Sequence, residues 1–298
     1  MKLTPLISPN ELLMLLQTEE FILIDASNNK NSKESYDKCH LEDALHVDLN
    51  SQLADIQSDF GIGGRHPLPQ LIHFSETLSI LGISKSSRVI IYDDKNCSNA
   101  ASRFWWMLKS IGHEKVQVLN GGFQAALKIG FPTSDKIETA NRSEIYQIEN
   151  WKLPLIDING IDKAILDDEF LIIDVRDEDR YNGLTEPIDL IAGHIPSAVN
   201  VPFQSNLNAE GFYLSASELK GKYLKVFDNR TSEKVIVHCG SGVTACHTLL
   251  AIASAGLEIP NLYVGSWSEW SRNGREIVGF PLWRGTEGED NRNFKKEE

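Results

Sequence analysis

The sequence has few cysteines for its length. Four occur in 298 residues: Cys39, Cys97, Cys239 and Cys246. They form no CxxC pair and no spacing typical of a disulfide framework, which fits a reducing compartment. His238 and His247 stand beside two of them, but together they match no zinc-binding spacing. We therefore expect a cytoplasmic protein without metal, cofactor or structural disulfides.

The chain also lacks long apolar runs and an excess of positive charge. No stretch reaches the roughly 18 apolar residues of a membrane span, and residues 1–5 are not followed by the apolar core of a signal peptide. Lys and Arg number 29 against 42 Asp and Glu, for a net charge of −13. Nucleic acids and anionic membranes both attract basic faces. We therefore exclude nucleic acid and membrane as partners.

A β-branched run that ends on a cysteine is the most informative stretch of the chain. Residues 235–239 read Val-Ile-Val-His-Cys, and 240–244 read Gly-Ser-Gly-Val-Thr. Apolar residues then recur at helical spacing up to residue 255. Cys239 is therefore predicted at a strand-to-helix turn, where backbone N–H groups and the helix dipole favour an anion such as a thiolate. A merely packed cysteine would not need the two loop glycines.

The two halves of the chain carry the same ordered series of segments. Residues 21–26 parallel 170–175, 40–48 parallel 194–202, 88–93 parallel 234–239, and 116–122 parallel 262–267. Each half alternates short apolar strands with helical stretches. This pattern predicts an α/β fold, with a parallel sheet in each half and helices on both of its faces.

The length exceeds that of a usual single domain, so the repeat predicts two. We expect a first domain over 1–135, a polar linker over 136–155, a second domain over 156–284 and a frayed, charged tail over 285–298.

The repeat also provides an internal control. Asp93 stands in the first half where Cys239 stands in the second. Because a carboxylate cannot act as a sulfur nucleophile, the first domain is predicted to be catalytically inactive and the second to be catalytic. Cys97 falls four residues beyond Asp93, and we interpret it, like Cys39 and Cys246, as an ordinary thiol.

Two α/β halves with a cysteine loop only in the second resemble the tandem rhodanese-type sulfurtransferases. Residues 92–93, 102–108 and 118–123 resemble the inactive domain of that family, and 174–181 with 193–196 resemble the segment that precedes its active loop. The resemblance covers nearly the whole chain. It implies two rhodanese-like domains, each with a central, mostly parallel β-sheet and helices on both faces.

Loop chemistry separates members of this family by sulfur donor. Thiosulfate-type members resemble Cys-Arg-Lys-Gly-Val-Thr, whereas the mercaptopyruvate type resembles Cys-Gly-Ser-Gly-Val-Thr, the sequence at 239–244. The resemblance thus implies transfer of sulfane sulfur from 3-mercaptopyruvate through a Cys239 persulfide to a small thiol, a thioredoxin-like protein or cyanide. Thiosulfate stays open as the donor, because mercaptopyruvate users tend to carry Glu-Pro-Arg where this chain has Glu186-Pro187-Ile188.

The resemblance also implies roles for individual residues. Cys239 is expected to be the nucleophile, and a Ser-His-Asp relay at the substrate thiol falls on Ser241, His66 and Asp48. A histidine that titrates near neutrality suits a thiol proton, and a carboxylate suits the orientation of the ring.

Substrate binding is expected from one arginine and the loop backbone. Arg180 presents a planar fork for the substrate carboxylate, and Arg176 is interpreted as an ion-pair partner that braces the loop. Backbone N–H groups of the loop are expected to stabilise the bound sulfur: Gly240, Gly242, Val243 and Thr244.

Two other functions stay open. A similar fold with a His-Cys loop can hydrolyse phosphate esters, but that chemistry needs an arginine where this chain has Ala245 and Cys246. The other is a module that carries persulfide to a partner protein or only contacts it; the intact Cys239 loop speaks against the purely structural version.

Overall fold

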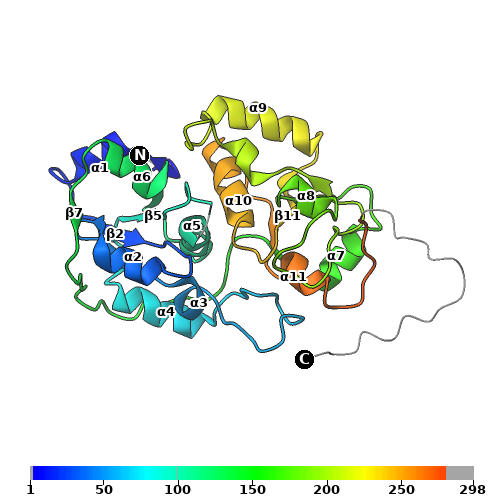
Figure 1. Ribbon diagram of the computed structural model, residues 1–298, viewed down its shortest axis with the longest axis horizontal. Helices are drawn as coiled ribbons and strands as arrows, with labels where there is room; N and C mark the ends of the chain where they lie inside the picture. The colour runs from blue at the N-terminus through cyan, green and yellow to red at the C-terminus, as the bar shows by residue number, and fades with distance from the viewer. Residues whose placement is uncertain (1–2, 99, 280–298) are drawn as a thin grey trace, which may run out of the picture.

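The computed structural model describes residues 3–98 and 100–279, so the tail expected over 285–298 lies outside the described residues. Each half of the chain forms one five-stranded sheet, and every strand pair in both sheets is parallel. The two halves lie side by side (Figure 1). The predicted α/β architecture is confirmed.

The first sheet has the strand order β1-β6-β5-β2-β4. Its strands are β1 (Leu6–Ile7), β2 (Ile22–Asp25), β4 (Leu45–His46), β5 (Val89–Tyr92) and β6 (Val116–Leu119). Its helices are α1 (Pro9–Leu15), α2 (Ser32–Lys38), α3 (Leu49–Gln52), α4 (Leu71–Ile80), α5 (Ala100–Ser110) and α6 (Gly122–Lys128). A short antiparallel pair, β3 (His40–Leu41) with β7 (Thr133–Ser134), stands apart.

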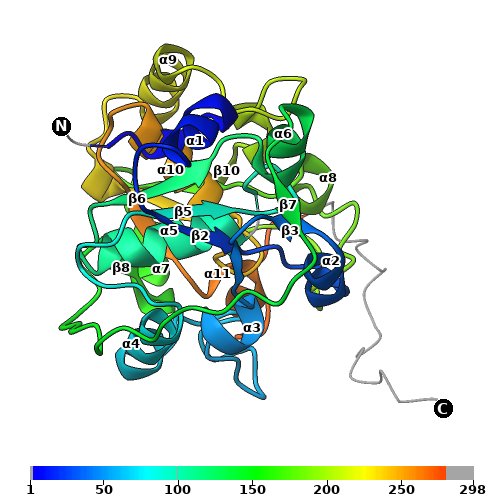
Figure 2. The same cartoon turned by 90° about the vertical axis from the view of Figure 1, so that its left-hand side faces the viewer.

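Both faces of this sheet are covered, as the nearly unbroken apolar strands require. Figure 2 shows α1 and α6 on one side of the strands and α4 and α5 on the other. Neighbouring strand residues accordingly enter different apolar clusters: Leu23 packs with Leu12 of α1, whereas Ile24 packs with Phe74 of α4.

The second sheet has the order β10-β9-β11-β12-β8. Its strands are β8 (Leu155–Ile156), β9 (Leu171–Asp174), β10 (Val199–Asn200), β11 (Val235–His238) and β12 (Asn261–Tyr263). Its helices are α7 (Ile158–Ala164), α8 (Glu178–Tyr181), α9 (Ala216–Phe227), α10 (Ala245–Ser254) and α11 (Ser266–Trp270), with 3₁₀ turns η1 (Phe203–Asn206) and η2 (Ser232–Lys234).

The two sheets repeat one another strand for strand. Reversing the second list gives β8-β12-β11-β9-β10, which matches the order of the first sheet, and the register agrees as well. Asp25 pairs with Tyr92 where Asp174 pairs with His238. The duplication read from the sequence is therefore a duplication of structure. Residues 135–154, all described, hold no helix or strand and connect the halves.

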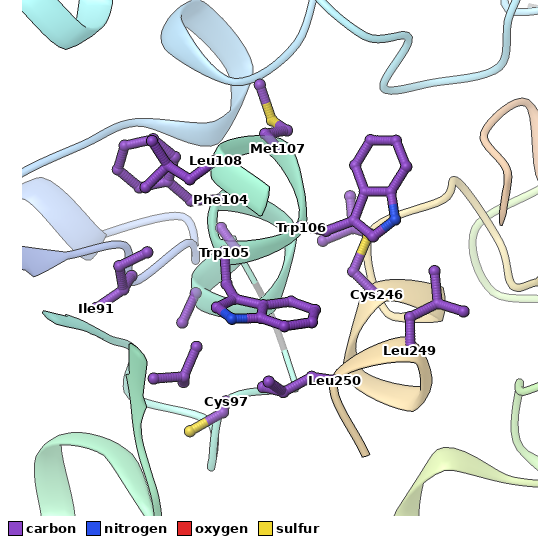
Figure 3. Packing of buried hydrophobic residues seen from close by; sticks show 14 of the residues in the cluster. Ile91, Cys97, Phe104, Trp105, Trp106, Met107, Leu108, Cys246, Leu249 and Leu250 are labelled. Atoms are coloured by element: carbon purple, nitrogen blue, oxygen red, sulfur yellow. The ribbon is translucent and has the colours of Figure 1, made fainter. Parts of the chain in front are cut away.

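Helices α5 and α10 join the halves through a shared apolar core. Figure 3 shows Trp105 and Trp106 of α5 facing Cys246, Leu249 and Leu250 of α10. All five side chains are buried and belong to one cluster that extends into both sheets. The carboxyl ends of β5 and β11 are thereby held near each other. Among the described residues, no helix is long and apolar enough to cross a membrane.

Candidate active site

The Cys239 loop connects β11 to α10 and is tied to the start of α11. Cys239 is only 3% exposed, and its N–H donates to Ser266 Oγ at 3.2 Å. Its carbonyl accepts from the N–H of Trp267 at 3.0 Å. Gly242 has φ +73°, and a Cβ there would lie 2.5 Å from the Val264 carbonyl oxygen. The predicted strand-to-helix turn is confirmed, and the loop glycine is required by its shape.

The backbone amides of the Cys239 loop, those of residues 240–244, have no acceptor among the described residues. The equivalent loop of the first half shows what such amides do. There the buried Asp93 carboxylate accepts from the N–H groups of Lys95, Cys97 and Ala101 at 2.9, 2.8 and 3.3 Å. A carboxylate thus occupies the centre of the loop in one half, and Cys239 stands at the matching position of the other.

His66 reaches the Cys239 loop from the other half of the chain. Its Nδ1 lies 2.8 Å from Ser241 Oγ. The segment that carries it, between α3 and α4, is docked on α11: the N–H of Gly63 donates to Glu269 at 2.8 Å, and that of Arg65 donates to Ser268 Oγ at 3.0 Å. The structure therefore brings Cys239, Ser241 and His66 together from two domains.

The His66 ring is neutral at physiological pH. Burial, followed by the nearby cations of Arg103 and Arg65, lowers the pKa of His66 to about 4. A neutral imidazole can accept a proton, as a group that serves a thiol must. Arg103 is itself fully buried and donates to the His66 carbonyl at 3.1 Å and to that of Gly242 at 3.4 Å. It connects α5 to both halves of the site.

Asp48 is not brought to this group. Its carboxylate accepts from the N–H of Ser51 at 2.8 Å and from Ser51 Oγ at 2.7 Å, as the N-cap of α3. Among the interactions of the described residues, none joins Asp48 to His66. The Oδ1 atom and the extended backbone of Asp48 both cap α3. Its place in a relay stays a prediction.

Arg176 is engaged on every side of its guanidinium. It lies 2.6 Å from Asp174 and 3.2 Å from Glu186, and it donates to the Gly193 carbonyl at 2.7 Å. Its guanidinium also stacks on Trp267, with the ring centre 4.6 Å away. With 3% of its surface exposed, Arg176 has no room for a substrate and holds the segment before the loop.

Arg180 lies against the loop itself. Its Nε and Nη2 donate to Glu186 at 3.2 and 2.7 Å. A Cβ on Gly240 would lie 3.5 Å from Arg180 Nη2 and 3.7 Å from its Nη1. The guanidinium is therefore next to the residue that follows Cys239, whereas the side chain of Ile188 is 56% exposed.

Charged residues that the sequence analysis did not single out complete the surroundings of the loop. They are Arg65, Arg103, Glu186, Asp189 and Arg272. The buried Asp189 carboxylate pairs with Arg65, with Arg272 at 3.0 Å and with Arg180 at 3.5 Å. Isolated charged residues in loops have no periodic pattern from which their place near Cys239 could be predicted. Arg103 is the exception, because it lies within an apolar helical stretch and could have been expected to be buried.

The remaining cysteines are placed as ordinary thiols. Cys97 Sγ donates to the Leu119 carbonyl, and burial raises the pKa of Cys97 well above its usual value. Burial also raises the pKa of Cys246 to about 12, so this thiol stays protonated. Cys39 is exposed. In residues 3–98 and 100–279, no three His, Cys, Asp or Glu side chains are grouped to hold a metal.

The chain matches known proteins over most of its length. A model of the rhodanese-like domain matches residues 8–128 and again 160–273. A Pseudomonas aeruginosa protein described as a probable 3-mercaptopyruvate sulfurtransferase is 35% identical over 245 residues, 82% of this chain and 85% of that protein. A thiosulfate sulfurtransferase of Rattus norvegicus is 33% identical over 84% of each chain.

Solved structures agree with this assignment. The 3-mercaptopyruvate sulfurtransferase of Leishmania major superposes with a TM-score of 0.78 at 28% identity, over 90% of this chain and 74% of that one. The duplicated sheets, the cysteine loop in the second half and these relatives lead to one conclusion: the chain belongs to the rhodanese-like family and is a two-domain sulfurtransferase.

Proposed function

We propose that this sulfurtransferase takes sulfur from 3-mercaptopyruvate and carries it as a persulfide on Cys239. The observation that supports this donor most directly is the 2.8 Å contact between His66 and Ser241, two residues from Cys239. Removal of sulfur from mercaptopyruvate leaves a carbanion that must gain a proton, whereas thiosulfate leaves as sulfite without one. A proton-handling pair beside the nucleophile is useful only for the first donor.

The first step moves one sulfur atom. The Cys239 thiolate attacks the donor sulfur, an S–S bond forms, and the carbon–sulfur bond breaks with its electron pair on carbon. The proton of the donor thiol passes through Ser241 and His66 to that carbon, so mercaptopyruvate becomes pyruvate and Cys239 becomes a persulfide anion. The amides of 240–244 stabilise the charge on sulfur as fixed donors. Arg180 binds the donor carboxylate.

The second step returns the enzyme to its starting state. A thiolate, or cyanide, attacks the outer sulfur, the S–S bond breaks, and its electrons remain on the Cys239 sulfur. This is covalent, ping-pong chemistry that needs only side chains and backbone of the chain itself. We expect a small thiol or a thioredoxin-like protein as acceptor. A nucleophile that must alternate between thiolate and persulfide also favours the reducing cytoplasm as the location.

Thiosulfate is the second candidate donor, and one observation favours it. The loop contains no cation, yet the guanidinium groups of Arg180 and Arg65 both lie beside Gly240. They supply positive charge from outside the loop, where a dianion could use it.

The test is steady-state transfer to cyanide with each donor in turn. We expect the wild type to prefer mercaptopyruvate and Cys239→Ser to lose all transfer. Cys246→Ser is the matched control, seven residues onward and buried, and should stay within about threefold of the wild type. Preference for thiosulfate would replace the proposed donor, and transfer by Cys239→Ser would exclude the persulfide route.

A further inference from the structure

Two arginines from different halves of the chain meet above the residue that follows Cys239. Arg65 stands between α3 and α4, directly before His66, and a Cβ on Gly240 would lie 3.2 Å from its Nη2. The same point is 3.5 Å from Arg180 Nη2. Ile188, not an arginine, follows Glu186-Pro187 directly, and the guanidinium that joins Arg180 beside Gly240 comes from the first half.

Each of the two guanidinium groups is held at one end and open at the other. Arg65 Nη1 donates to Asp189, and Arg180 donates to Glu186 through Nε and Nη2. Across residues 3–98 and 100–279, no protein acceptor is hydrogen-bonded to Arg65 Nη2 or Arg180 Nη1. The two side chains keep 15% and 13% of their surface exposed, enough for a small solute.

The carboxylates that hold these arginines are themselves buried and fixed. Asp189 Oδ1 also accepts from Arg272 at 3.0 Å, and the N–H of Asp189 donates to Glu186 at 3.0 Å. Asp189 Oδ2 has no hydrogen-bond partner among the described residues and lies 3.5 Å from Arg180. The two guanidinium groups are therefore positioned before any ligand arrives, which lowers the entropy cost of binding.

Docking of the two halves does not by itself explain the Arg65 side chain. The backbone N–H groups of Gly63 and Arg65 already anchor this segment on α11 through Glu269 and Ser268. The ion pair with Asp189 also uses only one nitrogen of Arg65, Nη1. What the guanidinium adds is a second, open nitrogen beside Gly240.

We propose that Arg65 and Arg180 together bind the carboxylate of the 2-oxo acid donor. The first half thus supplies a specificity-determining residue, Arg65, as well as His66. Arg65 provides the second guanidinium for the carboxylate, which the apolar side chain of Ile188 cannot do. This inference rests on the proposed function. Two guanidinium groups with open nitrogens fit a planar carboxylate better than they fit a neutral donor.

The test compares 3-mercaptopyruvate with its methyl ester, which keeps the sulfur and the ketone but removes the negative charge. Arg65→Gln retains an N–H for Asp189 and loses the cation. We expect its kcat/KM for the acid to fall about 10- to 100-fold, the range of a lost charge-assisted hydrogen bond, mainly through KM. For the ester the change should stay below about threefold.

Arg272→Gln is the matched control, because Arg272 also pairs with Asp189 but bonds the Ser268 carbonyl instead of lying at Gly240. It should leave the ratio of acid to ester unchanged. A second readout needs no turnover: pyruvate binding to Cys239→Ser, followed by calorimetry, should weaken by a similar factor when Arg65→Gln is added. Arg65→Lys keeps the charge, and its kcat/KM for the acid should fall less than that of Arg65→Gln. It is also the variant to use if Arg65→Gln does not fold.

The outcomes separate this inference from the proposed function. Equal losses for acid and ester in Arg65→Gln, with unchanged pyruvate binding, would show that Arg65 only positions the loop. A wild type that uses thiosulfate but not mercaptopyruvate would overturn the proposed donor, and with it this role for Arg65, before any variant is made.

Discussion

At the scale of single residues, the site depends on an imidazole that is kept neutral. His66 is half-buried beside two arginines, and both partial burial and charge oppose its protonation. Its partner Ser241 is 6% exposed, so bulk water has little access to that hydroxyl. Because its pKa is low, the ring is unprotonated at neutral pH and can accept a proton there. The pKa of His66 is therefore the quantity to measure.

The first prediction concerns that pKa. In a titration followed by NMR, the ring resonance of His66, assigned by its loss in His66→Gln, should shift with a pKa of about 4. Arg65→Gln removes one of the two neighbouring cations, so the pKa should rise in that variant. A wild-type pKa near the ordinary 6.5 would mean that the ring is solvated and not held as described.

The second prediction separates the cap from the relay. Asp48→Ala removes the hydrogen bonds to Ser51 and should cost about 1 kcal/mol of stability, as for other N-caps. Its kcat/KM should stay within about threefold of the wild type. Ser241→Ala should instead lower kcat/KM about 100-fold, the usual loss of a proton-transfer group. If both variants lose activity equally, Asp48 belongs to the relay.

Among the elements, the two repeats differ most informatively in the strand-to-helix loop that begins at Asp93 in one half and at Cys239 in the other. In both halves its first residue accepts, through its carbonyl, an N–H from the next strand-to-helix turn: Phe123 to Asp93 and Trp267 to Cys239, each at 3.0 Å. In the first half the side chain at that position is an anion satisfied by the loop amides. We propose that in the second half those donors serve the sulfur, so that one substitution would separate a structural loop from a catalytic one.

The third prediction tests the shape of this loop. Gly242→Ala combines a left-handed backbone with a Cβ 2.5 Å from the Val264 carbonyl oxygen, and should cost about 2–4 kcal/mol and most of the activity. Gly256→Ala is the matched control, with the same φ of +73° but nothing within 4 Å. It should cost about 1–2 kcal/mol and leave kcat/KM unchanged. Thermal unfolding and kinetics measure both; equal effects would contradict steric exclusion at Gly242.

At the scale of the whole molecule, one core and one site are shared between two domains. Helices α5 and α10 bury Trp105 against Leu250, while Arg103 donates to Gly242 across the same boundary. The second half therefore depends on the first for packing and for His66. We expect the halves to unfold together.

The fourth prediction concerns stability against pH. Burial lowers the folded-state pKa of several histidines, to about 4 for His66 and His113 and about 3 for His247. Since the unfolded pKa is about 6.5, the unfolded chain binds more protons below that pH, and stability falls as pH drops from 6.5 towards 4. Each of these three histidines should contribute about 1–2 kcal/mol of loss between pH 7 and pH 5.

Denaturant titrations at a series of pH values measure this loss, in a single transition that includes both halves. His247→Phe is the informative variant, because the His247 ring is fully buried, stacks on Tyr213 at 4.5 Å and has no hydrogen-bond partner among the described residues. It should flatten the pH dependence while the transition stays single. An unchanged slope would show that His247 is not buried as a neutral ring.

Much of this protein follows from short-range pattern. The strand spacing, the loop of small residues after Cys239 and the repeat with Asp93 are local features, and each led to an element or a duplication that the structure contains. Asp48 shows where local pattern is ambiguous, because its part in a relay stays a prediction while its side chain caps α3. An aspartate before a helix serves as a cap and looks the same in the sequence as one that orients a histidine.

Periodicity and residue type act over a few positions, so they were enough to predict the α/β duplication and the strand-to-helix turn at Cys239. The inactivity of the first half stays a prediction from Asp93. Which side chains surround the sulfur depends instead on tertiary packing. His66 and Ser241 are 175 positions apart, and Arg65 and Asp189 are 124 apart. Such contacts depend on how α5 packs on α10 and how the 53–70 segment docks on α11, and no local propensity encodes the relative placement of two domains.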